Sequence, residues 1–274
     1  MQHHSGKIIY ISFFLFISFW INAYPQQQSL EGIYLNAGPG WSYYKVRDEG
    51  MSPLLYKGSA GLVNLALYDI RKKGRHLLHA NFIYGKIKPS IYPDLSQSYA
   101  NLMRIDIDYS YQRFVKSWHS GKTVLFIGLN WQTFQTVKKQ AVYSNNAFNN
   151  TFVTSLGPSI MVLQRITGEK RNYLLTFQAS VPVFALIQRP SFAFSIADGA
   201  YNNSYSYFNN FLKSLRPTTL NHYQRINTSL TLFYMLKNGN AIKLGYNWDL
   251  YNYMPFNHVI SGSHELVVAT VFKF

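Results

Sequence analysis

Two carboxylates and an arginine stand at alternate positions of one short segment, and they are the first candidates for chemistry. Arg104, Asp106 and Asp108 alternate with apolar residues in the segment 103–108. In an extended strand residues i and i+2 share a face, so these three charges would lie together. Two close carboxylates can share a proton, which provides a base for activating water. The same charges can instead pair with opposite charges and hold a structure together.

Serine and histidine residues near the C-terminus are the second candidates. Ser261, Ser263 and His264 lie close in sequence, and nucleophilic catalysis needs a serine or water beside a histidine base and an orienting acid. His264 and Glu265 are adjacent, however, and adjacent strand residues face opposite sides. The other histidines are scattered, no Gly-x-Ser-x-Gly elbow occurs, and the chain has no cysteine. We therefore expect no catalytic residues, no metal site and no cofactor.

The composition favours an all-β protein. Of 274 residues, 17% are aromatic and only 14% are charged, whereas about 25% are charged in an average globular protein. The mean hydropathy of −0.10 excludes a bundle of membrane helices, and the many aromatic residues exclude disorder. Basic residues outnumber acidic residues by 26 to 11, which would also suit nucleic-acid binding. We do not expect a nucleic-acid partner, because the N-terminus described next predicts export from the cytoplasm.

The N-terminus has the pattern of a secretory signal peptide. Lys7 precedes an apolar stretch at residues 8–21, and Ala23 stands at the expected cleavage position. The stretch is shorter than the roughly 20 residues that a membrane-spanning helix requires. We expect residues 1–23 to be a cleaved signal peptide and residues 24–274 to form one exported domain.

In the exported domain, apolar and polar side chains alternate along several segments. In residues 241–251, 103–112 and 123–132, apolar side chains alternate with polar, charged or glycine residues. Strict alternation predicts β-strands, and about 10 residues is the length of a tilted strand that crosses a bilayer. We expect about ten strands, with eight or twelve as alternatives, at residues 30–45, 56–69, 75–87, 101–116, 121–135, 148–165, 171–188, 220–236, 240–253 and 260–274.

Short and long connections alternate between these strands. Short turns are expected at residues 69–75, 115–122, 165–171 and 236–240. Longer polar loops are expected at residues 46–55, 88–100, 136–147, 189–219 and 254–259. An even number of amphipathic strands, with short periplasmic turns and longer surface loops, predicts an antiparallel transmembrane β-barrel.

The last segment points to the same class of protein. Phe272 and the terminal Phe274 share one face, and they resemble the assembly signal at the end of bacterial outer-membrane barrels. The chain resembles small Gram-negative outer-membrane β-barrel proteins, and its Tyr- and Asn-rich, basic composition is similar to that of Bacteroidota members. The resemblance implies recognition by the barrel-assembly machinery, a place in the outer membrane, and contact with outer-membrane lipids including lipopolysaccharide.

Two groups of site residues follow from this barrel. An aromatic girdle at the outer end of rising strands would consist of Trp41, Tyr43, Trp131 and Trp248. A lumen charge network would consist of Arg104, Asp106, Asp108, Arg225, Asp249 and Glu265. Because buried charges must be paired, we expect this network to be structural, with Arg225 and Asp249 as its leading pair.

The enzymatic alternatives rest on resemblance. Asp106 and Asp108 resemble the paired acids of the omptin proteases, which are ten-stranded barrels, but the omptin Asp-x-His element is absent. Lipid A-modifying enzymes of the outer membrane are the other class. We expect a structural or surface-binding role without enzymatic activity, with an envelope protein complex as the setting. A narrow, porin-like channel for small solutes is the first alternative, and a rim hydrolase is the second.

Overall fold

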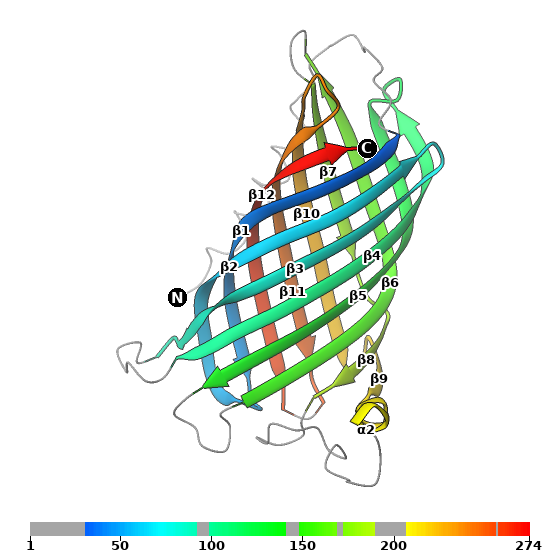
Figure 1. Cartoon of the computed structure of the whole chain (residues 1–274). Coiled ribbons are helices and arrows are strands. Elements are labelled where there is room, and N and C mark those ends of the chain that lie inside the picture. Colours follow the sequence, from blue (N-terminus) through cyan, green and yellow to red (C-terminus); the bar gives the residue numbers. More distant parts are fainter. Residues whose placement is uncertain (1–30, 92–98, 141–147, 169–171, 190–206, 256) are drawn as a thin grey trace, which may run out of the picture.

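The computed structural model describes residues 31–91, 99–140, 148–168, 172–189, 207–255 and 257–274. They form a closed antiparallel β-barrel of ten strands, which confirms the predicted fold class (Figure 1). The expected signal peptide at residues 1–23 lies outside the described residues. Within the described ranges, no helix is long and apolar enough to cross a membrane.

Most strands of the wall pair with the strands that precede and follow them in the chain. It begins with β1 (Gly32–Asp48), β2 (Ser52–Arg71), β3 (Gly74–Pro89), β4 (Ala100–Trp118), β5 (Thr123–Gln140) and β6 (Phe148–Thr167). It continues with β7 (Asn172–Ser180), β8 (Phe184–Gln188), helix α2 (Tyr207–Ser214), β9 (Arg216–Thr219), β10 (Tyr223–Met235), β11 (Ala241–Tyr253) and β12 (Val259–Lys273). β12 pairs with β1 and β5 pairs with β6, so the sheet closes on itself.

Two of the barrel strands are interrupted. β7 and β8 both pair with β6 and together make one strand of the wall. Pro182, which has no N–H to donate, lies in the break between them. The neighbouring Val181 and Val183 still donate their N–H groups to the carbonyls of Pro158 and Leu156, at 3.3 and 3.0 Å. β9 and β10 likewise share one position, with a break at residues 220–222.

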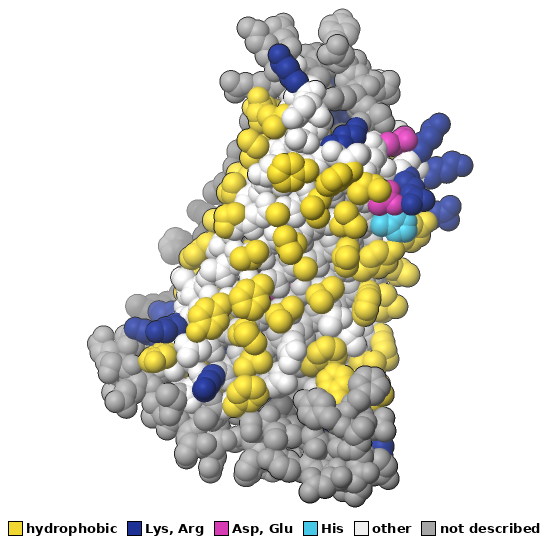
Figure 2. Space-filling model, viewed as in Figure 1, with side chains coloured by type: hydrophobic (Ala, Val, Ile, Leu, Met, Phe, Trp, Pro, Cys, Tyr) yellow, Lys and Arg dark blue, Asp and Glu magenta, His cyan; other side chains and the backbone are white. Residues whose placement is uncertain are grey.

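The alternating sequence pattern separates the two faces of the wall. On β4 the outward Ile105 and Ile107 are 39% and 46% exposed, whereas the inward Arg104 and Asp106 are 3% and 4% exposed. Apolar side chains cover the outside between basic groups at the two ends (Figure 2). An apolar exterior around a polar interior suits a wall surrounded by lipid, where every backbone group must be paired within the sheet.

The strands run further toward the surface loops than the sequence predicts. The expected long loop at residues 46–55 is wrong, because β1 continues to Asp48 and β2 begins at Ser52. The expected loop at 136–147 begins later, because β5 continues to Gln140. Part of the loop expected at 189–219 is helix α2 and strand β9. Charged residues at the ends of these strands have the composition of a loop, although they keep the alternation of a strand.

The lumen is packed with side chains in layers. An apolar cluster near the periplasmic turns includes Tyr34, Tyr68 and Phe233. A second cluster, toward the surface loops, includes Phe134 and Tyr251. Polar and charged side chains lie between and beyond these clusters, and they form the candidate site.

Candidate functional site

Four of the predicted network residues form one hydrogen-bonded group, here named the central ion-pair group: Arg104, Asp106, Arg225 and Asp249. Arg104 donates to Asp106 on its own strand, with Nη2 2.6 Å from Oδ1. It also donates across the lumen to Asp249 on β11, at 2.9 Å. Arg225 on β10 donates to the same carboxylate from Nε and Nη2, at 2.7 and 3.1 Å. The expected pair of Arg225 and Asp249 is therefore formed.

An aromatic ring supports both guanidinium groups. Phe134 of β5 is fully buried. Its ring centroid lies 4.6 Å from Cζ of Arg104 and 5.0 Å from Cζ of Arg225. A guanidinium over an aromatic face gains electrostatic attraction in a desolvated place. The central ion-pair group thus connects β4, β5, β10 and β11 through the middle of the lumen.

The other two predicted network residues have neutral or weakly basic neighbours. Asp108 Oδ2 lies 3.8 Å from Nδ1 of His79. Glu265 accepts long hydrogen bonds from Asn81, Asn247 and Ser263, at 3.4, 3.4 and 3.5 Å. The structure therefore places Asp108 and Glu265 beside the central ion-pair group without a direct bond to either of its arginines.

A second charged group lies nearer the surface loops, and the sequence analysis missed it. Lys138 and Arg189 both donate to the carboxylate of Asp48, and all three side chains are buried. We name these three residues the outer ion-pair group. It joins β1, β5 and the residue after β8. The composition around Asp48 and Lys138 predicts loops, but both residues continue the alternation of inward and outward side chains of their strands, and that alternation is the signal that identifies them.

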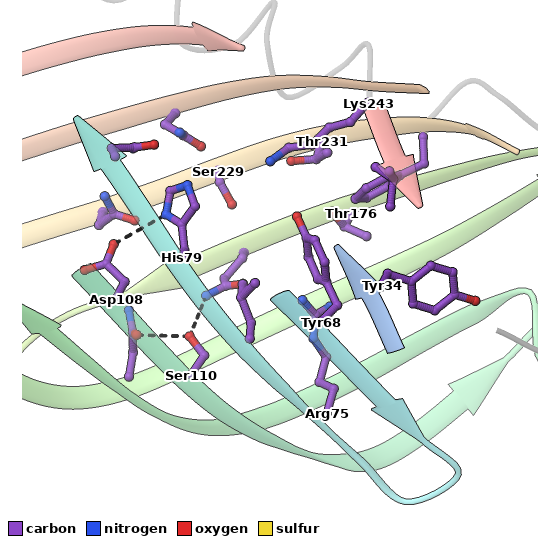
Figure 3. Close-up of a pocket in the computed structure, with 18 of the residues that line it drawn as sticks. Tyr34, Tyr68, Arg75, His79, Asp108, Ser110, Thr176, Ser229, Thr231 and Lys243 are labelled. Carbon is purple, nitrogen blue, oxygen red and sulfur yellow. Dashed lines mark hydrogen bonds and ion pairs between the residues drawn. The ribbon is translucent and has the colours of Figure 1, made fainter. Parts of the chain in front are cut away.

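A cavity of about 120 Å³ lies between the central ion-pair group and the periplasmic turns (Figure 3). Asn64 hydrogen-bonds to Asn81 and Lys243, two of the polar side chains that line it. Its amide donates to Asn81 at 2.8 Å, and its carbonyl oxygen accepts from Asn36 at 3.1 Å and from Lys243 at 3.2 Å. His79 also contacts the Asn64 amide. Such a cavity has room for several ordered water molecules.

The predicted girdle residues lie at the edge of the apolar exterior. Trp41 and Trp131 are outward and about half exposed, whereas Tyr43 and Trp248 are less exposed. Trp41 and Tyr43 stack, with ring centroids 6.2 Å apart. On β1 the next outward positions are Lys45 and Arg47, and on β5 they are Thr133 and Gln135, so on these two strands the girdle residues stand partway along the strand. The interpretation as a membrane girdle stays a prediction.

The C-terminal residues lie where β12 pairs with β1 and the barrel closes. Phe272 and Phe274 are 46% and 77% exposed on the outside. The N–H of Phe274 donates to the carbonyl of Ile33 on β1, at 2.9 Å. Their predicted role as an assembly signal is compatible with this outward placement and remains a prediction.

The catalytic candidates do not converge. His264 faces outward, with Nδ1 2.6 Å from the hydroxyl of Tyr246, whereas Ser261 and Ser263 are buried on the inward face. Asp106 is engaged by Arg104. Across the described part of the chain, no group of three or more His, Cys, Asp or Glu residues could hold a metal ion. The geometry thus gives no support to the rim hydrolase.

Comparison with known proteins gives neighbours in fold only. No family model matches the chain, and no curated protein matches it. Solved structures that are similar include the translocator domain of the autotransporter NalP from Neisseria meningitidis, at 8% identity and a TM-score of 0.39, covering 91% of this chain and 90% of that one. The outer membrane protease OmpT from Escherichia coli is similar at 7% identity and a TM-score of 0.45, covering 91% and 99%.

The outer membrane protein OprG from Pseudomonas aeruginosa is similar at 10% identity and a TM-score of 0.37, covering 89% of this chain and 96% of that one. These neighbours are Gram-negative outer-membrane β-barrels, and they differ in activity. The closed antiparallel wall, its apolar exterior and its charged central lumen define the fold as a transmembrane β-barrel of the outer-membrane type.

Proposed function

We propose that the protein is a non-conducting outer-membrane barrel with a structural or surface-binding role in the cell envelope and without enzymatic activity. The observation that carries the proposal is the bond between Arg104 and Asp249, which crosses the lumen from β4 to β11 at 2.9 Å. The outer ion-pair group adds a second connection nearer the surface. A pore would need open space where these side chains meet.

The energetics of buried charges support a permanent closure. Breaking a buried ion pair by removing one partner typically costs about 3–5 kcal/mol. Opening the lumen would separate at least the contact between Arg104 and Asp249, together with the packing of Phe134 against both arginines. We therefore infer that the two ion-pair groups keep opposite walls together under ordinary conditions.

A planar-bilayer recording tests this proposal. The native barrel should show no steady conductance. A variant that truncates both groups, with Arg104→Ala, Asp249→Ala, Asp48→Ala and Lys138→Ala, should conduct if it inserts as a closed barrel. The variant Asp69→Ala with Arg71→Ala, which breaks an exposed ion pair at the periplasmic end and also leaves the net charge unchanged, is the control. Steady conductance of the native protein would overturn the proposal.

A narrow channel for small solutes is the second candidate. The observation that favours it is the polar cavity on the periplasmic side of the central ion-pair group. In this alternative the ion pairs would rearrange to let a solute pass. Steady native conductance that disappears when Arg104 and Asp249 are covalently linked would support the channel.

The lipid partner that we propose is a phosphate-bearing lipid of the outer leaflet. Lys45, Lys57 and Lys88 are exposed on the outside of β1, β2 and β3, and they are direct neighbours across the strands. We name them the lysine row. Like charges directly opposite each other in a sheet are destabilising, and lipid phosphates would neutralise them. The row lies near the surface-loop ends of these three strands, at the height where we expect headgroups of the outer leaflet.

Export by the signal peptide at residues 1–23, assembly through Phe272 and Phe274, and an envelope protein partner also belong to this proposal. The exposed Phe274 at the seam between β12 and β1 supports the assembly role.

A further inference from the structure

Arg75 is a buried cation without an acidic partner. It lies at the periplasmic end of β3, points into the lumen and is 6% exposed. Among the described residues no carboxylate pairs with it. Its Nη1 contacts the sulfur of Met161, and its Nε has no hydrogen-bond partner. Cζ lies 6.0 Å from the ring centroid of Tyr68.

Lys243 is the second cation of the same cavity. It lies on β11, is also 6% exposed, and donates to the neutral Asn64. No acidic side chain in the described ranges pairs with it either. Figure 3 shows Tyr68 between Arg75 and Lys243, with Thr176 and Thr231 nearby. Two cations, a phenol and two hydroxyl groups therefore line this part of the cavity.

The acids of the cavity stand at its other end. Asp108 and Glu265 lie toward the central ion-pair group, beside His79 and Asn81. The two cations without an acidic partner thus lie nearer the periplasmic turns, whereas Asp108 and Glu265 lie nearer the paired arginines in the middle of the barrel.

The cavity reaches toward the periplasmic mouth. Its lining there includes Ile70, Leu77 and Met235, which are only partly buried. On the other side the central ion-pair group closes it. The periplasmic end is therefore the side from which we expect a small solute to reach Arg75.

Burying a charge without a counter-charge is costly, and an arginine presents a planar set of donors that suits carboxylate and phosphate oxygens. We propose that Arg75 and Lys243 form a periplasm-facing site for a small oxyanion, bearing a carboxylate or phosphate group, with Tyr68 beside it. The volume of about 120 Å³ limits the ligand to a small molecule. The site does not depend on whether the lumen conducts.

Calorimetric titration of the purified barrel in zwitterionic detergent tests the site. Inorganic phosphate and succinate are the probes, each at constant ionic strength, and chloride is the control anion. The native barrel should bind one of the two oxyanions saturably, and the preferred probe identifies the source of the anionic group. Arg75→Gln should weaken binding roughly tenfold or more, because it removes a charge-assisted hydrogen bond.

Arg113→Gln is the matched control, because Arg113 pairs with Gly74 at the same end of the wall but is exposed outside. It should leave binding unchanged. Lys243→Gln provides a second variant if Arg75→Gln does not form a closed barrel. Absence of saturable binding of both probes to the native protein would overturn the proposal, as would equal affinity in a folded variant lacking either cation.

Discussion

At the scale of single residues, Asp249 joins two arginines that come from different walls of the lumen. Its carboxylate accepts from Arg225 on the neighbouring strand and from Arg104 on the opposite wall. Arg104 keeps Asp106 if Asp249 is lost, whereas Arg225 has no second hydrogen-bonded carboxylate among the described residues. Removal of Asp249 therefore leaves one buried cation uncompensated.

This asymmetry gives a test of the central ion-pair group. Asp249→Asn should lower the free energy of unfolding by about 3–5 kcal/mol, because Arg225 stays buried without its partner. Arg225→Met should cost less, because Asp249 remains paired with Arg104. The double variant should be more stable than Asp249→Asn alone. Urea unfolding in detergent micelles measures all three.

The exposed pair of Arg71 and Asp69 is the control, with its arginine side chain 71% exposed. Its neutralisation should change stability little, because solvent screens exposed pairs. Strictly additive losses for Arg225 and Asp249 would show that these groups are solvated separately and that the lumen is wet.

The alternation of inward and outward residues along a strand predicts which side chains enter the lumen, but it does not predict their partners. Arg104, Asp106 and Asp249 could be placed inside from sequence because they alternate with apolar residues. The contact of Arg104 with Asp249 depends on the stagger between distant strands, which no local pattern contains. For the same reason, Glu265 faces inward as expected but meets amides instead of an arginine.

At the scale of strands and turns, the lysine row is a property of pairing register. Lys45, Lys57 and Lys88 are far apart in sequence, and only the antiparallel register makes them neighbours. No acidic side chain of the described residues pairs with them.

Replacement of the three lysines by glutamine should reduce the amount of lipid A that stays bound to the purified barrel. Native mass spectrometry of the barrel with added lipid A would measure the bound fraction. The triple variant of Lys72, Lys73 and Lys237, in the periplasmic turns, is the matched control and should retain lipid. Equal binding of dephosphorylated lipid A by the native protein would contradict the role of phosphate.

Turn positions were predictable where glycine and asparagine mark them, and the ends of strands were not. The turn at residues 236–240 lies where Asn238-Gly239 predicts it, with Gly239 at a φ of +87°, which glycine adopts without strain. The outer ends of β1 and β5 are charged and polar, which is typical of loops, and only the continuing alternation of inward and outward residues indicates that they are strands.

At the scale of the whole molecule, closure of the sheet has a consequence for stability in detergent. In the described part of the chain, every strand except the short β9, which pairs only with β8, has a neighbour on both sides, so the wall offers little free edge where unfolding could begin. The folded barrel should therefore migrate differently from the unfolded chain on SDS gels until it is boiled. Identical migration of boiled and unboiled samples would contradict a closed barrel.

The wall is longer than a membrane requires. β2 has 20 residues and β5 has 18, whereas about 9–11 residues suffice for a tilted strand to span the hydrocarbon. Because the outward positions of β1 and β5 beyond Tyr43 and Trp131 are mostly polar, we expect the surplus of these strands to project on the side of the surface loops. An antibody or phage approaching the cell would meet a rigid rim whose epitopes combine residues from adjacent strands, and those epitopes would exist only while the barrel is folded.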